Sequence, residues 1–392
     1  MKNRLLQLDI LRAIAIIMVL GSHTIGQKYA HYDIPLYFPH GFMAIWARCG
    51  WAGVDLFFVL SGFLVSGLLF SEFKKYGKVE VGRFLIRRGF KIYPAFYVFL
   101  GVTLTLNLYS RFVEGHSGLP GIGSYICEAL FVQNYGMHVW PHTWSLAVEE
   151  HFYLLLGLGV FLLTRNASKK NANPYAFIPR FFLIVAPLVL IMRMINVHFH
   201  PPVLYNGGWR VNGILTHLRV DSLLFGVLLS YYSNFHADAT AIIVNRYKWL
   251  ILGVSSLFAL TCIPLSMWST YMYTVGFTVL YLGFGGLLML MVHWDASRFK
   301  LNWLLRPLGL IGYYSYSIYL WHYAVNSWLP SLEKRISGTG EPLPVEYHTI
   351  VYIVGSLVVG MLMARIVEVP FLRLRDRLYP SRSTAAPREA VL

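Results

Sequence analysis

Ten apolar runs divide the chain, and most are long enough to cross a bilayer as a helix of about 20 residues. They cover residues 10–27, 50–70, 91–109, 143–163, 180–198, 213–232, 249–267, 271–292, 308–328 and 347–366. The pattern predicts an all-α polytopic integral membrane protein with about ten transmembrane helices. Composition agrees, since 56% of the 392 residues are hydrophobic and only 13% are charged.

Positive residues set the expected orientation in the membrane. They concentrate in the segments that face the cytoplasm if the N-terminus is cytoplasmic, as the positive-inside rule requires. The outer segments hold only Lys28, Arg48, Arg111, Arg210, Lys334 and Arg335. We therefore expect a multi-pass protein of the cytoplasmic (inner) cell membrane with both termini cytoplasmic. The net charge of +15 then reflects topology and lipid contact, and nucleic-acid binding is excluded.

A single membrane domain is expected at 1–370, followed by a basic, unstructured cytoplasmic tail at 371–392. The first run has the outline of a signal peptide but no convincing cleavage site, which favours an uncleaved anchor. The three cysteines, Cys49, Cys127 and Cys262, have no metal-binding spacing, so no metal site is expected. A disulfide between Cys49 and Cys127 stays open.

Arg12 and His23 lie in the first run, DILRAIAIIMVLGSH. Eleven residues make almost three helical turns, so both side chains share a face about 16 Å apart along the axis. Ionisable groups in a membrane helix usually face a bundle interior or a wet cavity and mark function. The alternative is that Arg12 only reaches the headgroups and His23 only bonds a neighbouring helix.

A basic ridge precedes the third run, in RFLIRRGFKIYPAF. Arg87, Arg88 and Lys91 lie close together if the segment is helical, and Pro94 suits the first turn of a membrane helix that starts there. Guanidinium groups bind phosphate oxygens in a bidentate manner. We therefore assign Arg87, Arg88, Lys91 and Tyr93 to a site for a phosphate-bearing cytoplasmic donor, against the alternative of contact with anionic lipid.

The segment WSLAVEEHFYLL places Glu149 and Glu150 beside Trp144 and Ser145. Adjacent carboxylates in a membrane are costly unless they are paired or used. Glu149 is expected to orient and polarise a histidine from another helix. The alternative is a structural pair with Arg210 or Arg219.

Three further clusters are expected to support a site. Ser61 is more typical of close helix packing than of an acyl carrier. Outer aromatic residues suit stacking on sugars or an interfacial belt equally. The clusters contribute Asp55 and Ser61 in GVDLFFVLSGF, Arg219 and Asp221 in HLRVDSLLFG, and Tyr319 and His322 in SYSIYLWH.

Taken in order, these motifs resemble the acyltransferase-3 family of membrane O-acyltransferases. The matching elements are Arg-x10-His, FFVLSGF, RRGFKIYP, WSLAVEE, RVDSLLFG and SYSIYLWH, and they span most of the chain. Lys91 stands where the family usually has arginine, and His151 where glutamine is common. These departures leave the class intact but bear on the choice of donor or acceptor.

The resemblance implies transfer of an acyl group, most often acetyl, from cytoplasmic acyl-CoA to a hydroxyl of an envelope or exported glycan. It implies an essential His23 with Arg12 as companion, acetyl-CoA as co-substrate and no bound cofactor. Many relatives carry an extracytoplasmic esterase-like domain. This chain shows none, so either the membrane domain suffices or a separate partner completes the reaction.

The expected chemistry is attack of a hydroxyl on a thioester with His23 as base, because imidazole titrates near neutral pH. Glu149 would orient His23, and Arg12 would position the donor. A proton-coupled transporter or flippase is the main rival, since intramembrane ionisable residues also mark carriers. A catalytically inactive subunit is a third reading, in which loss of His23 is harmless.

Overall fold

The computed structural model describes residues 6–24, 40–113, 115, 120–165, 173–202, 211–265, 267–294, 302–336 and 343–382, and every regular element among them is helical. The helices are α1 (Leu6–Ser22), α3 (His40–Cys49), α4 (Gly53–Tyr76), α5 (Val81–Phe112), α6 (Ile122–Ala129), α7 (Trp144–Arg165), α8 (Ile178–Phe199), α10 (Val220–Phe235), α11 (Ala237–Arg246), α12 (Lys248–Ala259), α13 (Phe277–Val292), α14 (Asn302–Tyr313), α15 (Ser315–Ile336), α16 (Val345–Met363) and α17 (Val369–Leu378). Short 3₁₀ turns precede α4 (Gly50–Ala52) and α7 (Pro141–Thr143), and π-helical turns precede α13 (Met272–Gly276) and α17 (Ala364–Glu368).

Within these residues, six helices are long and apolar enough to cross a membrane, or seven if the bent pair Ala237–Arg246 and Lys248–Cys262 counts as one crossing. The six are Met43–Tyr76, Val81–Phe112, Pro141–Thr164, Ile178–Phe199, Met272–Val292 and Glu346–Leu378. The protein is therefore a multi-pass membrane protein. The expected runs at 10–27 and 213–232 form shorter helices, of 17 residues in α1 and 16 in α10.

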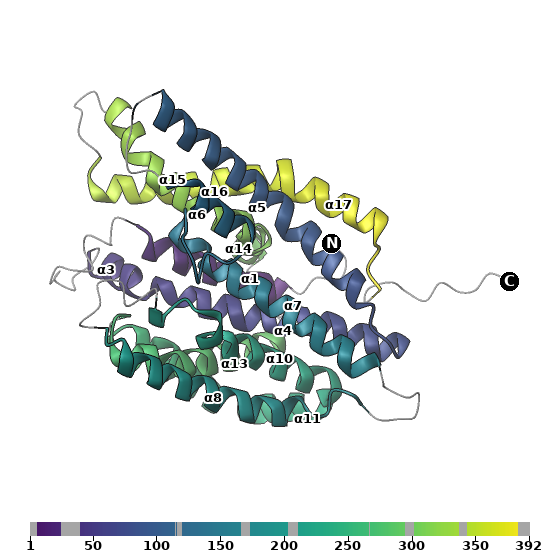
Figure 1. Ribbon diagram of the computed structural model, residues 1–392. Helices are drawn as coiled ribbons and strands as arrows, with labels where there is room; N and C mark the ends of the chain where they lie inside the picture. The colour runs from purple at the N-terminus through teal and green to yellow at the C-terminus, as the bar shows by residue number, and fades with distance from the viewer. Residues whose placement is uncertain are drawn as a thin grey trace.

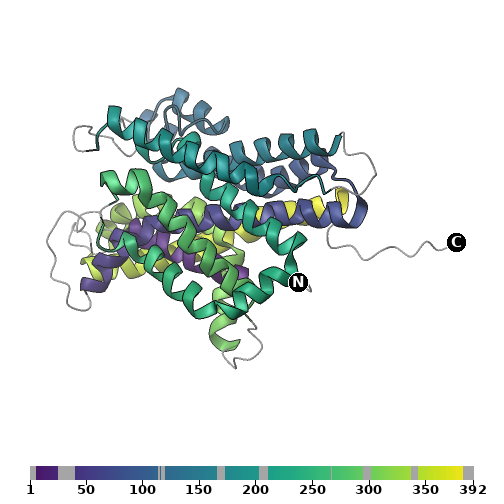
Figure 2. The same ribbon diagram turned by 90° about the horizontal axis from the view of Figure 1, so that it is seen from below.

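Helix α1 is enclosed by the bundle. It packs against α4 and α14, and also touches α3, α13 and α15. In Figures 1 and 2, α4 crosses the middle of the bundle; α3 lies at the left-hand end in Figure 1 and the α4–α5 turn at the right-hand end. Because α1 faces protein on most sides, its ionisable residues lie against other helices and the cavities between them.

Glycines bring α4 and α10 into close contact. A Cβ on Gly62 would overlap the carbonyl oxygen of Leu223, and a Cβ on Gly226 would overlap that of Val59. Small residues that let backbones approach are characteristic of membrane helix pairs. The close-packing interpretation of the Ser61 segment is thus borne out at its neighbour Gly62, and α4 is held firmly beside the helix that follows Arg219.

Three expectations about local structure are wrong. No membrane helix starts at Pro94, because α5 runs unbroken from Val81 to Phe112 with Pro94 inside it, and the basic ridge is part of that helix. The run at 308–328 is broken at Tyr314, between α14 and α15. The predicted unstructured tail begins as helix α17, while residues 383–392 lie outside the described part of the chain.

Cys49 and Cys127 are both free thiols, and the Cys49 Sγ lies 3.4 Å from the carbonyl oxygen of Cys262. The disulfide that the sequence left open is absent.

Candidate active site

Two cavities lie beside α1 and share part of one wall. The larger is about 700 Å³ and is lined by His23, His142, Trp144, Arg219 and Tyr323 among others. The smaller is about 90 Å³ and is lined by Arg12, Ser61, Arg88, Lys91 and Glu149 among others. Val54 and Tyr319 line both. Arg12 and His23 therefore line two neighbouring cavities.

His23 lies just beyond the end of α1 and pairs with His322 of α15. The His23 Nδ1 and His322 Nε2 atoms are 3.1 Å apart, and His322 Nδ1 lies 2.5 Å from the carbonyl oxygen of Tyr319. A carbonyl only accepts, so His322 carries its proton on Nδ1, and neutral His322 accepts from His23 Nδ1–H. His23 Nε2 is then the unprotonated nitrogen, which is the form a general base requires.

The backbone of His23 is anchored by a buried polar chain. Asn326 Nδ2 donates to the His23 carbonyl at 2.6 Å, and the Asn326 Oδ1 faces His348 Nε2 at 3.4 Å. His348 Nδ1 lies 2.9 Å from a carboxylate oxygen of Glu333. Helices α15 and α16 thereby fix the position of the residue that follows α1.

His142 is a residue that the sequence reasoning missed. It is 2% exposed, lies edge-on to His322 with ring centroids 4.9 Å apart, and stacks on Tyr323 at 5.2 Å. Its Nε2 lies 3.2 Å from the carbonyl oxygen of Leu320. The only sequence signal is its position two residues before the start of WSLAVEE. No three His, Cys, Asp or Glu residues in the described ranges are arranged to hold a metal ion.

Glu128 of α6 holds the turn that carries His142. Its carboxylate accepts hydrogen bonds from the backbone N–H groups of Val139 and Trp140, both at 3.0 Å, and from the Thr143 hydroxyl at 2.8 Å. Burial raises the pKa of Glu128 to about 7, because removal from water disfavours the charged carboxylate. The sequence reasoning did not single out Glu128.

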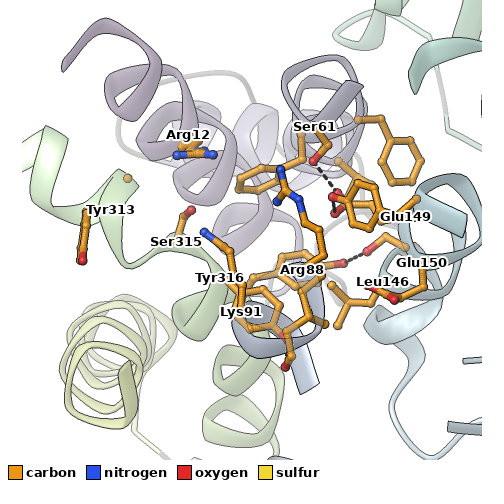
Figure 3. Close-up of a pocket in the computed structure, with 18 residues that line it drawn as sticks. Arg12, Ser61, Arg88, Lys91, Leu146, Glu149, Glu150, Tyr313, Ser315 and Tyr316 are labelled. Carbon is orange, nitrogen blue, oxygen red and sulfur yellow. Dashed lines mark hydrogen bonds between the residues drawn. The ribbon is translucent and has the colours of Figure 1, made fainter. Parts of the chain in front are cut away.

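Charged residues of both signs line the smaller cavity (Figure 3). Glu149 and Glu150 lie on one side, Arg12, Lys91 and Ser315 on the other, and the Arg88 side chain extends between them. The Arg88 guanidinium also lies over the Tyr153 ring, 5.2 Å from its centroid. Arg12 bonds Asp9 one turn earlier, at 3.1 Å. Of the expected donor-binding residues, Arg88 and Lys91 reach this cavity.

The other two expected donor-binding residues, Arg87 and Tyr93, do not line the smaller cavity. Arg87 forms an ion pair with Asp376 at 3.1 Å and donates to the carbonyl oxygen of Tyr379, so it binds the C-terminal segment. The Tyr93 hydroxyl donates to Glu150 at 3.0 Å, behind the wall of the smaller cavity. Neither residue lines that cavity, and their role in donor binding stays a prediction.

The expected pairing of Glu149 with His23 is not formed. Glu149 accepts from the Ser61 hydroxyl at 3.0 Å and from Tyr153 at 2.6 Å, on the wall of the smaller cavity. His322 takes the place beside His23 that the sequence reasoning gave to Glu149. Ser61 is a hydrogen-bond donor to that carboxylate.

Two buried ion pairs brace α4, α8 and α10. Arg219 binds Asp55 at 2.7 Å, and Arg193 binds Asp221, with all four side chains at most 1% exposed. The Arg219 guanidinium lies 3.6 Å above the Phe277 ring. The alternative partnership of Arg219 with Glu149 is thus wrong, and Arg210 lies outside the described residues. Asp55 and Asp221 are structural partners of arginine.

Tyr319 divides the two cavities and is fixed by hydrogen bonds. Its hydroxyl donates to the His142 carbonyl at 2.7 Å and lies 2.6 Å from the Ser145 hydroxyl. Trp144 lines the larger cavity and Ser145 the smaller. The expected supporting residues Trp144, Ser145, Tyr319 and His322 therefore gather at one boundary.

This fold and site define a helical multi-pass membrane protein with a histidine pair beside the larger of two neighbouring cavities. A family model described as an acyltransferase domain matches residues 5–365. The chain therefore belongs to the acyltransferase-3 family, as the order of its motifs predicted. The family is one of acyltransferases, and the prediction of an acyltransferase enzyme is confirmed at that level.

Curated relatives are named as O-acetyltransferases. The chain is 28% identical over 333 residues to O-acetyltransferase OatA of Staphylococcus aureus (strain NCTC 8325 / PS 47), covering 81% of this chain and 50% of the relative. It is 27% identical over 386 residues to peptidoglycan O-acetyltransferase OatA of Listeria monocytogenes, covering 93% and 55%.

A putative O-acetyltransferase of S. aureus (strain MRSA252) is 27% identical over 401 residues, covering 97% of this chain and 59% of the relative. The chain thus spans about half the length of the curated relatives it matches. No solved structure matches it significantly.

Proposed function

We propose that the protein is a membrane O-acetyltransferase that moves an acetyl group from cytoplasmic acetyl-CoA to a hydroxyl of an envelope or exported glycan. One observation carries the proposal: the His23–His322 pair opens into a large cavity that meets a cation-lined pocket at Val54 and Tyr319. A donor held by Arg88 and Lys91 and an acceptor beside His23 would meet at that boundary.

The proposed reaction uses His23 as general base. His23 Nε2 takes the proton of the acceptor hydroxyl as its oxygen attacks the thioester carbonyl carbon, forming a C–O bond. The C–S bond then breaks, and the imidazolium returns its proton to the departing thiolate. The products are the O-acetyl ester and CoA thiol, with His23 restored. His322 orients His23 by accepting its Nδ1–H, and Arg12 helps to position the donor.

Donor binding, acceptor class and membrane placement belong to the same proposal. The donor is a co-substrate, and no resident cofactor is required by the chemistry. The acceptor is proposed to be a glycan, a class supported by relatives named for O-acetylation and, in one case, for peptidoglycan. Ten crossings with both termini cytoplasmic would put the basic end of α5 on the donor side of the inner membrane. A separate extracytoplasmic partner is proposed only where the acceptor lies beyond the membrane surface.

The proposal is tested with purified protein in nanodiscs and radiolabelled acetyl-CoA. Label release and label transfer to an envelope-glycan fraction are measured for the wild type, for His23→Ala and for His198→Ala, an exposed histidine at the end of α8. We expect His23→Ala to lower transfer by about 10²- to 10⁴-fold, the usual contribution of general-base catalysis, and His198→Ala to retain it.

Two results would overturn this function. Folded His23→Ala with wild-type transfer would remove the base assigned here. Net movement of a glycan precursor across vesicles, with no acyl product, would instead identify a carrier.

A further inference from the structure

Helix α17 follows the part of the chain that the family model matches, which ends at residue 365. It lies beside the first half of α5 in Figure 1 and contacts that helix. The segment after α17 continues the contact: Arg83 Nη2 donates to the carbonyl oxygen of Pro380 at 2.7 Å. Arg382 then binds Glu80 at 2.7 Å. The C-terminal segment is therefore attached to the start of α5.

This contact gathers positive charge from two helices. We name as the phosphate platform the arginines of these two contacting helices at this end of α5: Arg83 and Arg87 of α5, and Arg373, Arg375 and Arg377 of α17. Arg83 and Arg87, like Arg373 and Arg377, are spaced i and i+4, a spacing at which like charges destabilise a helix. Only Glu80 and Asp376 form ion pairs with platform arginines in the described part of the chain.

Arg373 and Arg377 are exposed and form no ion pair with a described residue. Arg375 is engaged by its neighbour Asp376, at 2.9 Å. A cationic surface with so few counter-charges binds anions readily, and arginine favours phosphate through its planar fork of donors.

The platform continues into the smaller cavity along α5. Arg83 and Arg87 precede Arg88 and Lys91, and eight residues of helix from Arg83 to Lys91 span about 12 Å. Arg88 and Lys91 line the cavity, whereas Arg87 reaches α17. A ligand with a polyanionic head and a long uncharged arm would place its head on the platform and its arm along α5.

We propose that the phosphate platform binds the nucleotide phosphates of the acyl donor, so that α17 is part of the donor site. This rests on the proposed function, in which the donor is acetyl-CoA. CoA carries a 3′-phosphate and a diphosphate on its adenosine end, and its thioester lies at the end of the pantetheine arm. The expected role of Arg87 in donor binding is kept in this proposal, through the phosphates of the nucleotide end.

The test compares three donors that share the thioester: acetyl-CoA, acetyl-dephospho-CoA without the 3′-phosphate, and acetyl-pantetheine without the nucleotide. The variant is the triple substitution Arg373→Gln, Arg375→Gln and Arg377→Gln. Its control removes the same charge elsewhere, as Arg180→Gln, Arg246→Gln and Lys248→Gln, which are exposed positions on or near α8, α11 and α12. KM and kcat are measured in nanodiscs of zwitterionic lipid at fixed ionic strength.

We expect the wild type to have a KM for acetyl-CoA about tenfold or more below that for acetyl-dephospho-CoA. The platform variant should raise the KM for acetyl-CoA about tenfold and bring the KM values of the three donors together, with kcat little changed. The control should keep the wild-type ratios. Equal donor ratios in the wild type and the platform variant would overturn the proposal.

Anionic lipid headgroups present the same phosphate chemistry and are separated by a second arm with added phosphatidylglycerol. If the variant differs from the wild type only when that lipid is present, the platform binds lipid and the proposal is wrong. Equilibrium binding of CoA against dephospho-CoA provides a readout that does not need turnover. Preferential, platform-dependent CoA binding without transfer to any acceptor would support this inference while contradicting the proposed acetyl transfer.

Discussion

The two cavities beside α1 differ in the charged residues that line them. The smaller is walled by charges of both signs, including Arg88, Lys91, Glu149 and Glu150. The larger has no carboxylate among its described lining residues, which combine imidazole and aromatic rings with aliphatic side chains and the two arginines Arg48 and Arg219. Charge selects and positions a polyanionic molecule, whereas neutral imidazoles and aromatic faces suit a sugar and a proton transfer. The difference indicates that binding and base chemistry are separated, with Tyr319 between them.

The largest expected effect on this division is the loss of the His23 partner. His322→Phe removes the acceptor for His23 Nδ1–H, so the imidazole loses its fixed tautomer and kcat should fall about 10²-fold. His322→Gln keeps a side-chain oxygen that can accept this hydrogen bond and should recover part of the loss. Single-turnover acetyl transfer at saturating donor measures both.

KM for acetyl-CoA serves as the control for these variants, because His322 does not line the cation-lined pocket. A His322→Phe protein that keeps the wild-type kcat would show that the pairing is only structural.

Arg88→Ala tests the role of the smaller cavity in donor binding. Arg88 extends between the carboxylates and the cations of the smaller cavity (Figure 3), so its loss should raise the KM for acetyl-CoA about tenfold and leave kcat within a few-fold. Arg88→Lys retains the charge and should be intermediate. Arg246→Ala, at an exposed site on α11, is the matched control.

A fall in kcat with unchanged KM in Arg88→Ala would contradict the assignment of binding to this cavity. It would indicate that the guanidinium acts on the reacting atoms.

Tyr319→Phe tests the residue that separates the two cavities, and it should change kcat less than His322→Phe does. The phenol hydroxyl donates to the His142 carbonyl and contacts Ser145, so its removal leaves buried groups without their partner, at a cost of about 1–3 kcal/mol. We expect a lower apparent Tm and a several-fold lower kcat. The ratio of acetyl-CoA hydrolysis to transfer should rise, because the boundary no longer holds one geometry.

Tyr316→Phe provides the comparison, since the Tyr316 hydroxyl donates to the Ile92 carbonyl at 2.9 Å and lines only the smaller cavity. Equal hydrolysis ratios in both variants would argue against a special role for Tyr319.

The sequence was most informative where local periodicity or motif order carried the signal. The order of the motifs identified the family, which the comparison confirms. The spacing of Arg12 and His23 predicted one helix face, although His23 lies just beyond the end of α1. Helix existence followed from apolar runs in the same way. The break at Tyr314 and the continuity of α5 through Pro94 were missed, because tertiary packing decides whether a proline starts a helix or is tolerated inside one.

The hydrogen-bond partners of the site residues could not be predicted, because these bonds join residues that are far apart in the sequence. His23 and His322 are 299 residues apart, and the Ser61 to Glu149 bond spans 88. Glu149 was a reasonable partner for a histidine on chemical grounds, yet its place in space depends on how α4 and α7 pack. His142 and Glu128 lie in or near an irregular segment without any periodic pattern.

Glu128 gives the smallest expected effect and a test of how the ring-lined cavity is supported. Its pKa of about 7 exceeds the ordinary value of 4.5, so the folded protein keeps a proton that the unfolded chain releases between these pH values. The contribution of this group to stability is therefore complete below about pH 4.5 and is lost as pH rises through about 7. The shift corresponds to about 3 kcal/mol.

Glu128→Gln mimics the protonated carboxyl at every pH. From pH 5 to pH 8, the apparent Tm of the wild type should fall by a few degrees relative to Glu128→Gln, as measured by thermal unfolding in detergent. Asp238→Asn, an exposed acid on α11, should show no such trend. A constant difference between Glu128→Gln and the wild type would mean that Glu128 stays ionised throughout. The turn that carries His142 would then be held by a carboxylate charge at all these pH values, and the larger cavity would share with the smaller one a reliance on fixed charge.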